Sequence, residues 1–365
     1  MKKILDQILR GGLSVYRFFQ YKMFGRQSIG ILKPGKTVQL EPFQVEINHG
    51  DVVHPCVRYI SEGYEGHKWW MVYTPYYGAN SRMENPILCY SDSKTEQPPT
   101  DWKVYCLVNE QPETGFNSDP TLLYNGGVLY VYWRENDTPK TLKYGYHRVT
   151  YGGIVRNGGV EKAHIPIVYT KDSEEDAETC PTFMVNGEDS LVCYAMHLRF
   201  HSKRVQNLKS PWKGLVEGII AFTDLLGIYS QQKHYGIAIW EGKDALSQFK
   251  YQKTVRFNNC NGLYRPWHMD LFDYGGKRYA IVQTNQCNAD ICLAESLDGE
   301  TFFFLSKPLL TNRSLGVKGM YKPCAGVTSG GVFYLYYTAQ NTNNRGVNKL
   351  YVTSMPFNHL LNLLK

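Results

Sequence analysis

The sequence lacks the motifs of several common enzyme classes. It contains no P-loop, no G-x-G-x-x-G and no G-x-S-x-G, so neither a nucleotide-binding fold nor a serine nucleophile elbow is predicted. No window of about 20 apolar residues occurs, which excludes a membrane-spanning helix. The nine cysteines are irregularly spaced and form no C-x-x-C pair. We therefore expect reduced, mostly buried thiols, and we predict no cofactor and no metal.

Aromatic residues are abundant instead, at 14% of 365 residues, and 28 of them are tyrosine. Tyrosine combines an apolar face with a polar tip, so this excess favours a β-rich fold or a surface that binds sugars. The net charge of +7 is mild and spread along the chain. It would suit an acidic glycan or an anionic membrane surface, but it is not a nucleic-acid footprint.

One pattern recurs five times: a polar residue, proline, a short apolar run, a glycine turn and an aromatic strand. The clearest copy is "NSDPTLLYNGGVLYVYWR" at 117–134, and in the fourth copy His268 fills the proline position. Short alternating strands separated by Asn, Gly and Asp turns predict antiparallel sheet. Five repeats of roughly 60 residues, each with three or four strands, predict an all-β, five-bladed β-propeller. A β-sandwich with accidental internal similarity is the alternative.

Each proline should open the strand that lines the central channel, because proline has no N–H to donate to a sheet. The residue before it is biased towards an extended conformation at the channel mouth. We therefore expect these residues to converge on one pocket: His54, Asp119, Cys180, Arg265 and Lys322.

Three carboxylates lie at or just before these strand starts, namely Asp51, Asp119 and Glu178. Glycoside cleavage needs one carboxylic acid to protonate the leaving oxygen and a second carboxylate to activate water or attack the sugar. A third acid nearby can raise the pKa of the first by like-charge repulsion. The alternative for each is a turn-capping carboxylate bonded to the backbone.

The hairpin "SDPTLLYNGGVLYVYWR", with "WHMD" at 267–270 and "MYKP" at 320–323, resembles the five-bladed propeller glycoside hydrolases of the arabinanase, β-xylosidase and levansucrase group. The resemblance covers roughly residues 45–355. It implies that Asp51 is the base, Asp119 the pKa modulator and Glu178 the general acid, with inversion at the anomeric carbon. The chain departs from the group in blade one, where His54 stands directly before the proline.

The same strand starts also supply candidate substrate contacts. Cations near the channel either balance the acids or bind an anionic group of the substrate, since Arg offers a planar donor fork. Tryptophan rings pack against the C–H faces of sugars. The candidate substrate-binding residues are His54, Arg58, Trp133, Arg265, Trp267, His268, Asp270 and Lys322.

Three segments lie outside the predicted blades. Residues 1–44 form a basic arm with apolar residues at helical spacing, which either lies on a membrane surface or packs against the propeller. Residues 199–232 form a helical insertion between blades three and four, a candidate lid or docking surface. Residues 356–365 form a tail that ends in a short helix or a strand extension.

The sequence thus predicts a carbohydrate-active enzyme that cleaves or transfers a glycosidic bond in the propeller funnel. Its partner is a carbohydrate or glycoconjugate, not a nucleic acid. The alternatives are a non-catalytic glycan-binding or scaffold propeller that serves surface-polysaccharide assembly, and a glycoside phosphorylase. The interrupted apolar run after "MKK" predicts no secretory signal, hence a cytoplasmic protein with possible peripheral contact at the inner membrane.

Overall fold

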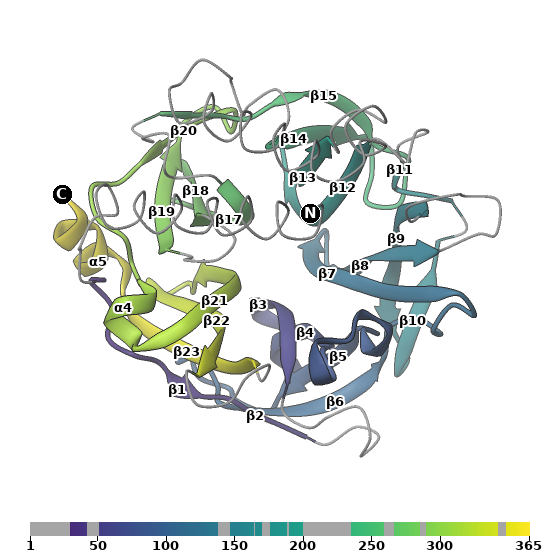
Figure 1. Cartoon of the computed structure of the whole chain (residues 1–365), viewed down its shortest axis with the longest axis horizontal. Coiled ribbons are helices and arrows are strands. Elements are labelled where there is room, and N and C mark those ends of the chain that lie inside the picture. The colour runs from purple at the N-terminus through teal and green to yellow at the C-terminus, as the bar shows by residue number, and fades with distance from the viewer. Residues whose placement is uncertain are drawn as a thin grey trace, which may run out of the picture.

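The chain forms a ring of five β-sheets around a central axis (Figure 1). The computed structural model describes residues 30–41, 51–137, 147–163, 165–169, 176–187, 190–199, 235–258, 266–284, 290–341 and 348–365. The inner strand of each sheet contacts the inner strands of its two neighbours. The five-bladed β-propeller predicted from the repeats is therefore confirmed, and a β-sandwich is excluded.

The first three blades follow one another along the chain. Blade one has the strand order β2-β6-β5-β4-β3, with β2 (Gln39–Leu40), β3 (Val52–Tyr64), β4 (His67–Pro75), β5 (Ile87–Ser91) and β6 (Asp101–Leu107). Two 3-10 turns, η1 (Tyr77–Ala79) and η2 (Ser81–Met83), precede β5. Blade two consists of β7 (Gly115–Asn125), β8 (Val128–Asp137), β9 (His147–Arg156), β10 (Gly159–Lys162) and β11 (Val168–Tyr169). Blade three consists of β12 (Asp176–Val185), β13 (Leu191–Arg199), β14 (Tyr235–Gly242) and β15 (Lys250–Thr254).

The last two blades complete the ring. Blade four consists of β17 (Pro266–Tyr274), β18 (Lys277–Thr284), β19 (Asp290–Ser296), β20 (Thr301–Phe304) and the parallel edge strand β16 (Arg256–Asn258). Blade five consists of β21 (Val317–Val327), β22 (Val332–Asn341) and β23 (Asn348–Pro356), preceded by the short helix α4 (Asn312–Leu315). The tail forms helix α5 (Phe357–Leu364), which packs its buried residues on blades four and five.

The ring is closed by the segment that precedes blade one. Strand β1 (Lys36–Thr37) pairs with β23 of blade five, and β2 (Gln39–Leu40) pairs in parallel with β6 of blade one. The carboxylate of Glu96 adds a second tie, because it accepts hydrogen bonds from the turn at 328–330 of blade five. The first and last blades are thus joined by both backbone and side chains.

The packing of β4 shows why this strand has no polar face. Trp69 and Met71 pack towards blade five, against residues such as Tyr334. Trp70 and Val72 point the other way, into the core shared with blade two. Because a neighbouring blade covers each face, successive residues are all apolar instead of alternating with polar ones.

Several predicted segments lie outside the described residues. These are most of the arm (1–29 and 42–44), nearly all of the helical insertion (200–232) and Arg265. Among the described helices, none has the length and apolar character that crossing a membrane requires.

Candidate active site

The inner strand of every blade is interrupted at the same point by a β-bulge, where the pairing register shifts. In four blades the bulge holds an X-Pro pair, which lies inside the strand and not at its start as expected. The expected extended conformation of X is also wrong, because X has a positive φ: His54 (+55°), Asp119 (+50°), Cys180 (+51°) and Lys322 (+31°). This conformation is uncommon for residues other than glycine and costs about 1–2 kcal/mol each. Strain of this kind concentrates at functional sites. The strained backbone therefore marks these four residues as candidate site residues.

Blade four has no proline at its bulge. Pro266 still pairs with Thr284, whereas His268 already pairs with Gln283, so Trp267 is the extra residue. By register, His268 takes the place of the proline and Trp267 the place of the residue before it. The sequence assigned the second position to Arg265, which precedes Pro266 in the chain but lies outside the described residues.

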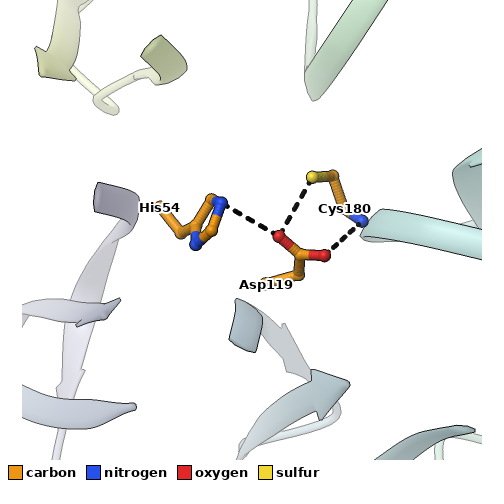
Figure 2. Close-up of side chains that lie close together, drawn as sticks. All are labelled: His54, Asp119 and Cys180. Atoms are coloured by element: carbon orange, nitrogen blue, oxygen red, sulfur yellow. Dashed lines mark hydrogen bonds and ion pairs between the residues drawn. The ribbon is translucent and has the colours of Figure 1, made fainter. Parts of the chain in front are cut away.

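Asp119 lies at the centre of the converging side chains (Figure 2). Its Oδ1 is 3.0 Å from His54 Nε2 and accepts a hydrogen bond from the Cys180 thiol at 3.1 Å. Its Oδ2 forms an ion pair with Arg134 at 2.7 Å and accepts the backbone N–H of Cys180 at 3.2 Å. Asp119 is only 1% exposed, and burial alone would raise its pKa. The charges of Arg134 and Lys322 and the nearby imidazole outweigh burial, so the pKa falls below its ordinary value and the carboxylate stays ionised.

His54 occupies the blade-one position where the resemblance expects an acid. Burial lowers the pKa of its imidazole to about 3, although the negative charge of Asp119 acts to raise it. The ring is therefore neutral near pH 7. Its Nε2 is 3.3 Å from the hydroxyl of Tyr321 in blade five. Its Nδ1 lies 3.6 Å from Oε2 of Glu84.

Glu84 was missed by the sequence reasoning. It follows the turn η2, is 5% exposed, and lies on the other side of His54 from Asp119. Burial raises the pKa of Glu84 well above its ordinary value of 4.5, and the charge of Asp119 raises it further. Glu84 lies in the loop between β4 and β5, not at a strand start. An acid in "MENP", two residues before a proline in such a loop, is the only local signal.

The other two predicted acids have partners of their own. Oε1 of Glu178, in blade three, is 2.5 Å from Nδ1 of His197 on the adjacent strand. Oδ1 of Asp51 accepts both the backbone and the side-chain N–H of Asn348, which ties blade one to blade five. Burial raises the pKa of Asp51, and the two bonds from Asn348 partly offset that shift.

Arg58 and Asp270 form a two-pronged ion pair across the middle of the propeller. Nη1 and Nη2 of Arg58 donate to the two carboxylate oxygens at 3.0 and 2.8 Å. Arg58 also donates to the carbonyl of Leu122, and Asp270 accepts the N–H of Ala325. The pair therefore joins four blades. Arg58 and Asp270, which were predicted to bind substrate, thus have a structural role.

Lys322 is also engaged with protein groups. It is buried, and its Nζ donates to the carbonyl of Pro120 at 3.3 Å. Its backbone N–H donates to the side chain of Gln283 at 2.6 Å. Its charge still acts on the centre, because it helps to lower the pKa values of Asp119 and His268.

The two tryptophans predicted to form sugar platforms differ in exposure. Trp133 is 0% exposed and packs between blades one and two, so its ring belongs to the core and offers no face to a sugar here. Trp267 is half-buried, and its ring meets His268 edge-on. Of the two, only Trp267 has ring surface available for a ligand.

The comparisons with known proteins identify enzymes with this fold. No protein-family model matches the sequence, and the search of curated proteins returns no match. The N-acetylgalactosamine deacetylase from F. plautii, solved with blood group B trisaccharide, has a TM-score of 0.65 and 16% identity, over 92% of this chain and 98% of that chain. The GH43_1 enzyme from Xanthomonas citri, solved with xylotriose, has a TM-score of 0.57 and 12% identity, over 89% and 90%. The Bombyx mori GH32 β-fructofuranosidase has a TM-score of 0.56 and 11% identity, over 100% and 72%.

The chain has the fold of these enzymes. The predicted resemblance to the propeller glycoside hydrolases is confirmed at the level of the fold. At such low identity the similarity does not carry over residues or reactions, so the activity must be argued from the site itself.

Proposed function

We propose that the chain is a carbohydrate-active enzyme that cleaves or transfers a glycosidic bond at the centre of the propeller. The observation that carries the proposal is the pair of buried carboxyl groups on either side of His54. The pKa of Asp119 is held below its ordinary value, whereas that of Glu84 is raised well above it. Glycosidic cleavage uses a protonated acid together with an ionised carboxylate, and displaced pKa values are how enzymes create such a pair.

In this proposal Asp119 is the fixed negative charge. It raises the pKa of a neighbouring acid, which is the role that the resemblance gives to this residue, and Glu84 is the neighbour on which it acts. Two residues compete for the role of general acid: Glu178 from the resemblance and Glu84 from the electrostatics. Asp51 remains the proposed base, although its carboxylate is bonded to Asn348 of blade five.

The test is a screen of the purified full chain with aryl furanosides, aryl pyranosides and oligosaccharides, each with and without phosphate. Glu84→Gln and Glu178→Gln would be assayed beside Glu113→Gln, which alters an exposed carboxylate. Loss of the general acid should lower kcat about 10²–10⁴-fold for poor leaving groups and much less for activated aryl groups. The variant that shows this dependence identifies the acid.

Other outcomes separate the alternatives. Turnover that requires phosphate would indicate a phosphorylase. Glycan binding without turnover by the wild type would contradict the proposal and favour a non-catalytic propeller. Equal leaving-group dependence in wild type and both Glu→Gln variants would exclude Glu84 and Glu178 as the acid.

A second candidate is the removal of an acetyl group from an N-acetylated sugar. It is favoured by His54, a neutral imidazole held by the ionised Asp119 in the position where the glycoside hydrolases are expected to have an acid. A histidine oriented by a carboxylate is a common general base for the hydrolysis of acyl groups. Acetate release from N-acetylated sugars, measured in the same screen and lost in His54→Gln, would select this reaction over glycosidic cleavage.

A further inference from the structure

The central side chains of blades one, two and three offer three different metal-ligand atoms at one point. His54 Nε2, Asp119 Oδ1 and Cys180 Sγ all lie within 4.8 Å of one another, and all three residues are buried. Figure 2 shows the imidazole of blade one and the thiol of blade three approaching the carboxylate of blade two from its two sides. We propose that His54, Asp119 and Cys180 bind a Zn²⁺ ion and leave its fourth coordination position open. This inference does not depend on which reaction the protein catalyses.

The chemistry of the donor set selects the ion. Imidazole nitrogen and thiolate sulfur are ligands of zinc and other borderline or soft transition metals, whereas Ca²⁺ and Mg²⁺ prefer oxygen alone. Three protein ligands with one open position are the arrangement in which zinc accepts water or a substrate atom.

The distances are close to those that a tetrahedral ion requires. Zn–N and Zn–O bonds of about 2.0–2.1 Å and a Zn–S bond of about 2.3 Å place N and O about 3.3 Å apart, and S and O about 3.5 Å apart. The corresponding distances here are 3.0 Å from His54 Nε2 to Asp119 Oδ1 and 3.1 Å from Cys180 Sγ to the same oxygen. Side-chain shifts of a few tenths of an ångström would bring both of these distances to the tetrahedral values, and the third pair, His54 Nε2 and Cys180 Sγ, lies within 4.8 Å.

Groups around the three ligands already orient them. The second oxygen of Asp119 is occupied by Arg134 and the N–H of Cys180, which leaves Oδ1 to face the other two ligands. The second nitrogen of His54 lies 3.6 Å from Oε2 of Glu84, just beyond hydrogen-bond distance, so a small movement of either side chain would join them. A carboxyl group on the far nitrogen of a ligating histidine is the usual support for such a ligand, because it fixes the tautomer and the ring orientation.

An independent observation points to a missing ligand at the same centre. His268 is 2% exposed, and neither of its ring nitrogens has a hydrogen-bond partner among the described residues. Its ring packs edge-on against Tyr321, whose hydroxyl is 3.3 Å from His54 Nε2. A buried imidazole without a partner is costly, so a bound group that supplies one is expected beside it.

The test uses tag-free, chelator-treated full-length protein titrated with Zn²⁺ or with Co²⁺ as a spectroscopic probe. The proposal predicts one ion per chain, a sulfur-to-cobalt charge-transfer band, and a rise in the unfolding temperature when Zn²⁺ is added. Cys180→Ser and His54→Gln should each weaken binding at least tenfold. Cys180→Ser should also remove the band, whereas Cys193→Ala, at a buried thiol elsewhere in blade three, should retain all three signals.

Folding of each variant is checked by its unfolding temperature without metal, so a lost signal cannot be mistaken for a lost fold. If the wild type binds no Co²⁺ with a charge-transfer band, the proposal is wrong. Stoichiometric binding that survives in both Cys180→Ser and His54→Gln would also overturn it, because the ion would then lie elsewhere in the chain.

Discussion

The buried ion pair between Arg58 and Asp270 is expected to stabilise the centre of the propeller, and a single substitution tests this. The side chains are 15% and 5% exposed, and two hydrogen bonds join them. Asp270→Asn keeps the shape of the side chain but removes its charge, which leaves the guanidinium buried without a counter-ion. Breaking a buried pair from one side costs about 3–5 kcal/mol. We expect a loss near the lower end of this range, because the amide oxygen of Asn can still accept one bond.

The measurement is urea unfolding followed by tryptophan fluorescence, with the midpoints compared at constant slope. The matched control is Asp92→Asn, which breaks an exposed ion pair with Lys103 and should leave the midpoint unchanged. Removing both central charges in Arg58→Met/Asp270→Leu should restore part of the stability that either single substitution loses. An unfolding free energy for Asp270→Asn within about 0.5 kcal/mol of wild type would refute this reasoning and return Asp270 to a ligand-binding role.

Three further predictions concern other parts of the fold. The pKa of Glu84 is raised in the folded state, so folding is progressively penalised as the pH rises above 4.5. Glu84→Gln should therefore gain stability relative to wild type between pH 5 and pH 8 in thermal unfolding; a difference that is constant with pH would contradict the shift. Glu96→Gln weakens the tie to the turn at 328–330 and should lower the unfolding free energy by about 1 kcal/mol in urea titrations; no change would show that β1 and β2 close the ring unaided. In Gly35→Ala the added Cβ would lie 2.6 Å from the carbonyl oxygen of Val352, so β1 should detach from blade five. The backbone amides of β1 should then exchange their hydrogens with solvent faster. Unchanged hydrogen exchange would show that the backbone adapts.

The sequence predicts the fold because its evidence is local and repeated. The "SDP" hairpin and its four relatives each encode a bulged inner strand and a tight turn within about 20 residues. Five such signals in one chain leave few architectures other than a propeller. The expected alternation of apolar and polar residues does not hold in β4, because a neighbouring blade covers each of its faces.

The site is less predictable because its contacts span the ring. Arg58 and Asp270 are 212 residues apart in sequence, and nothing near either of them indicates the pairing. Trp133 is a residue type that often packs against sugars, but its burial depends on how blade one packs against blade two. Glu84 comes from a loop whose position becomes evident only when η2 and the inner strands are assembled.

The most direct test of the central claim is the rate of glycosidic cleavage by wild type and Asp119→Asn, with sugar binding measured by calorimetry on the same samples. We expect the wild type to cleave at least one glycoside of the panel. We expect the variant, still folded, to lose about 10²-fold or more in kcat while product affinity changes little, because the lost charge acts on the reacting groups. Cleavage by Asp119→Asn at the wild-type rate, or no cleavage of any glycoside by the wild type, would contradict the claim.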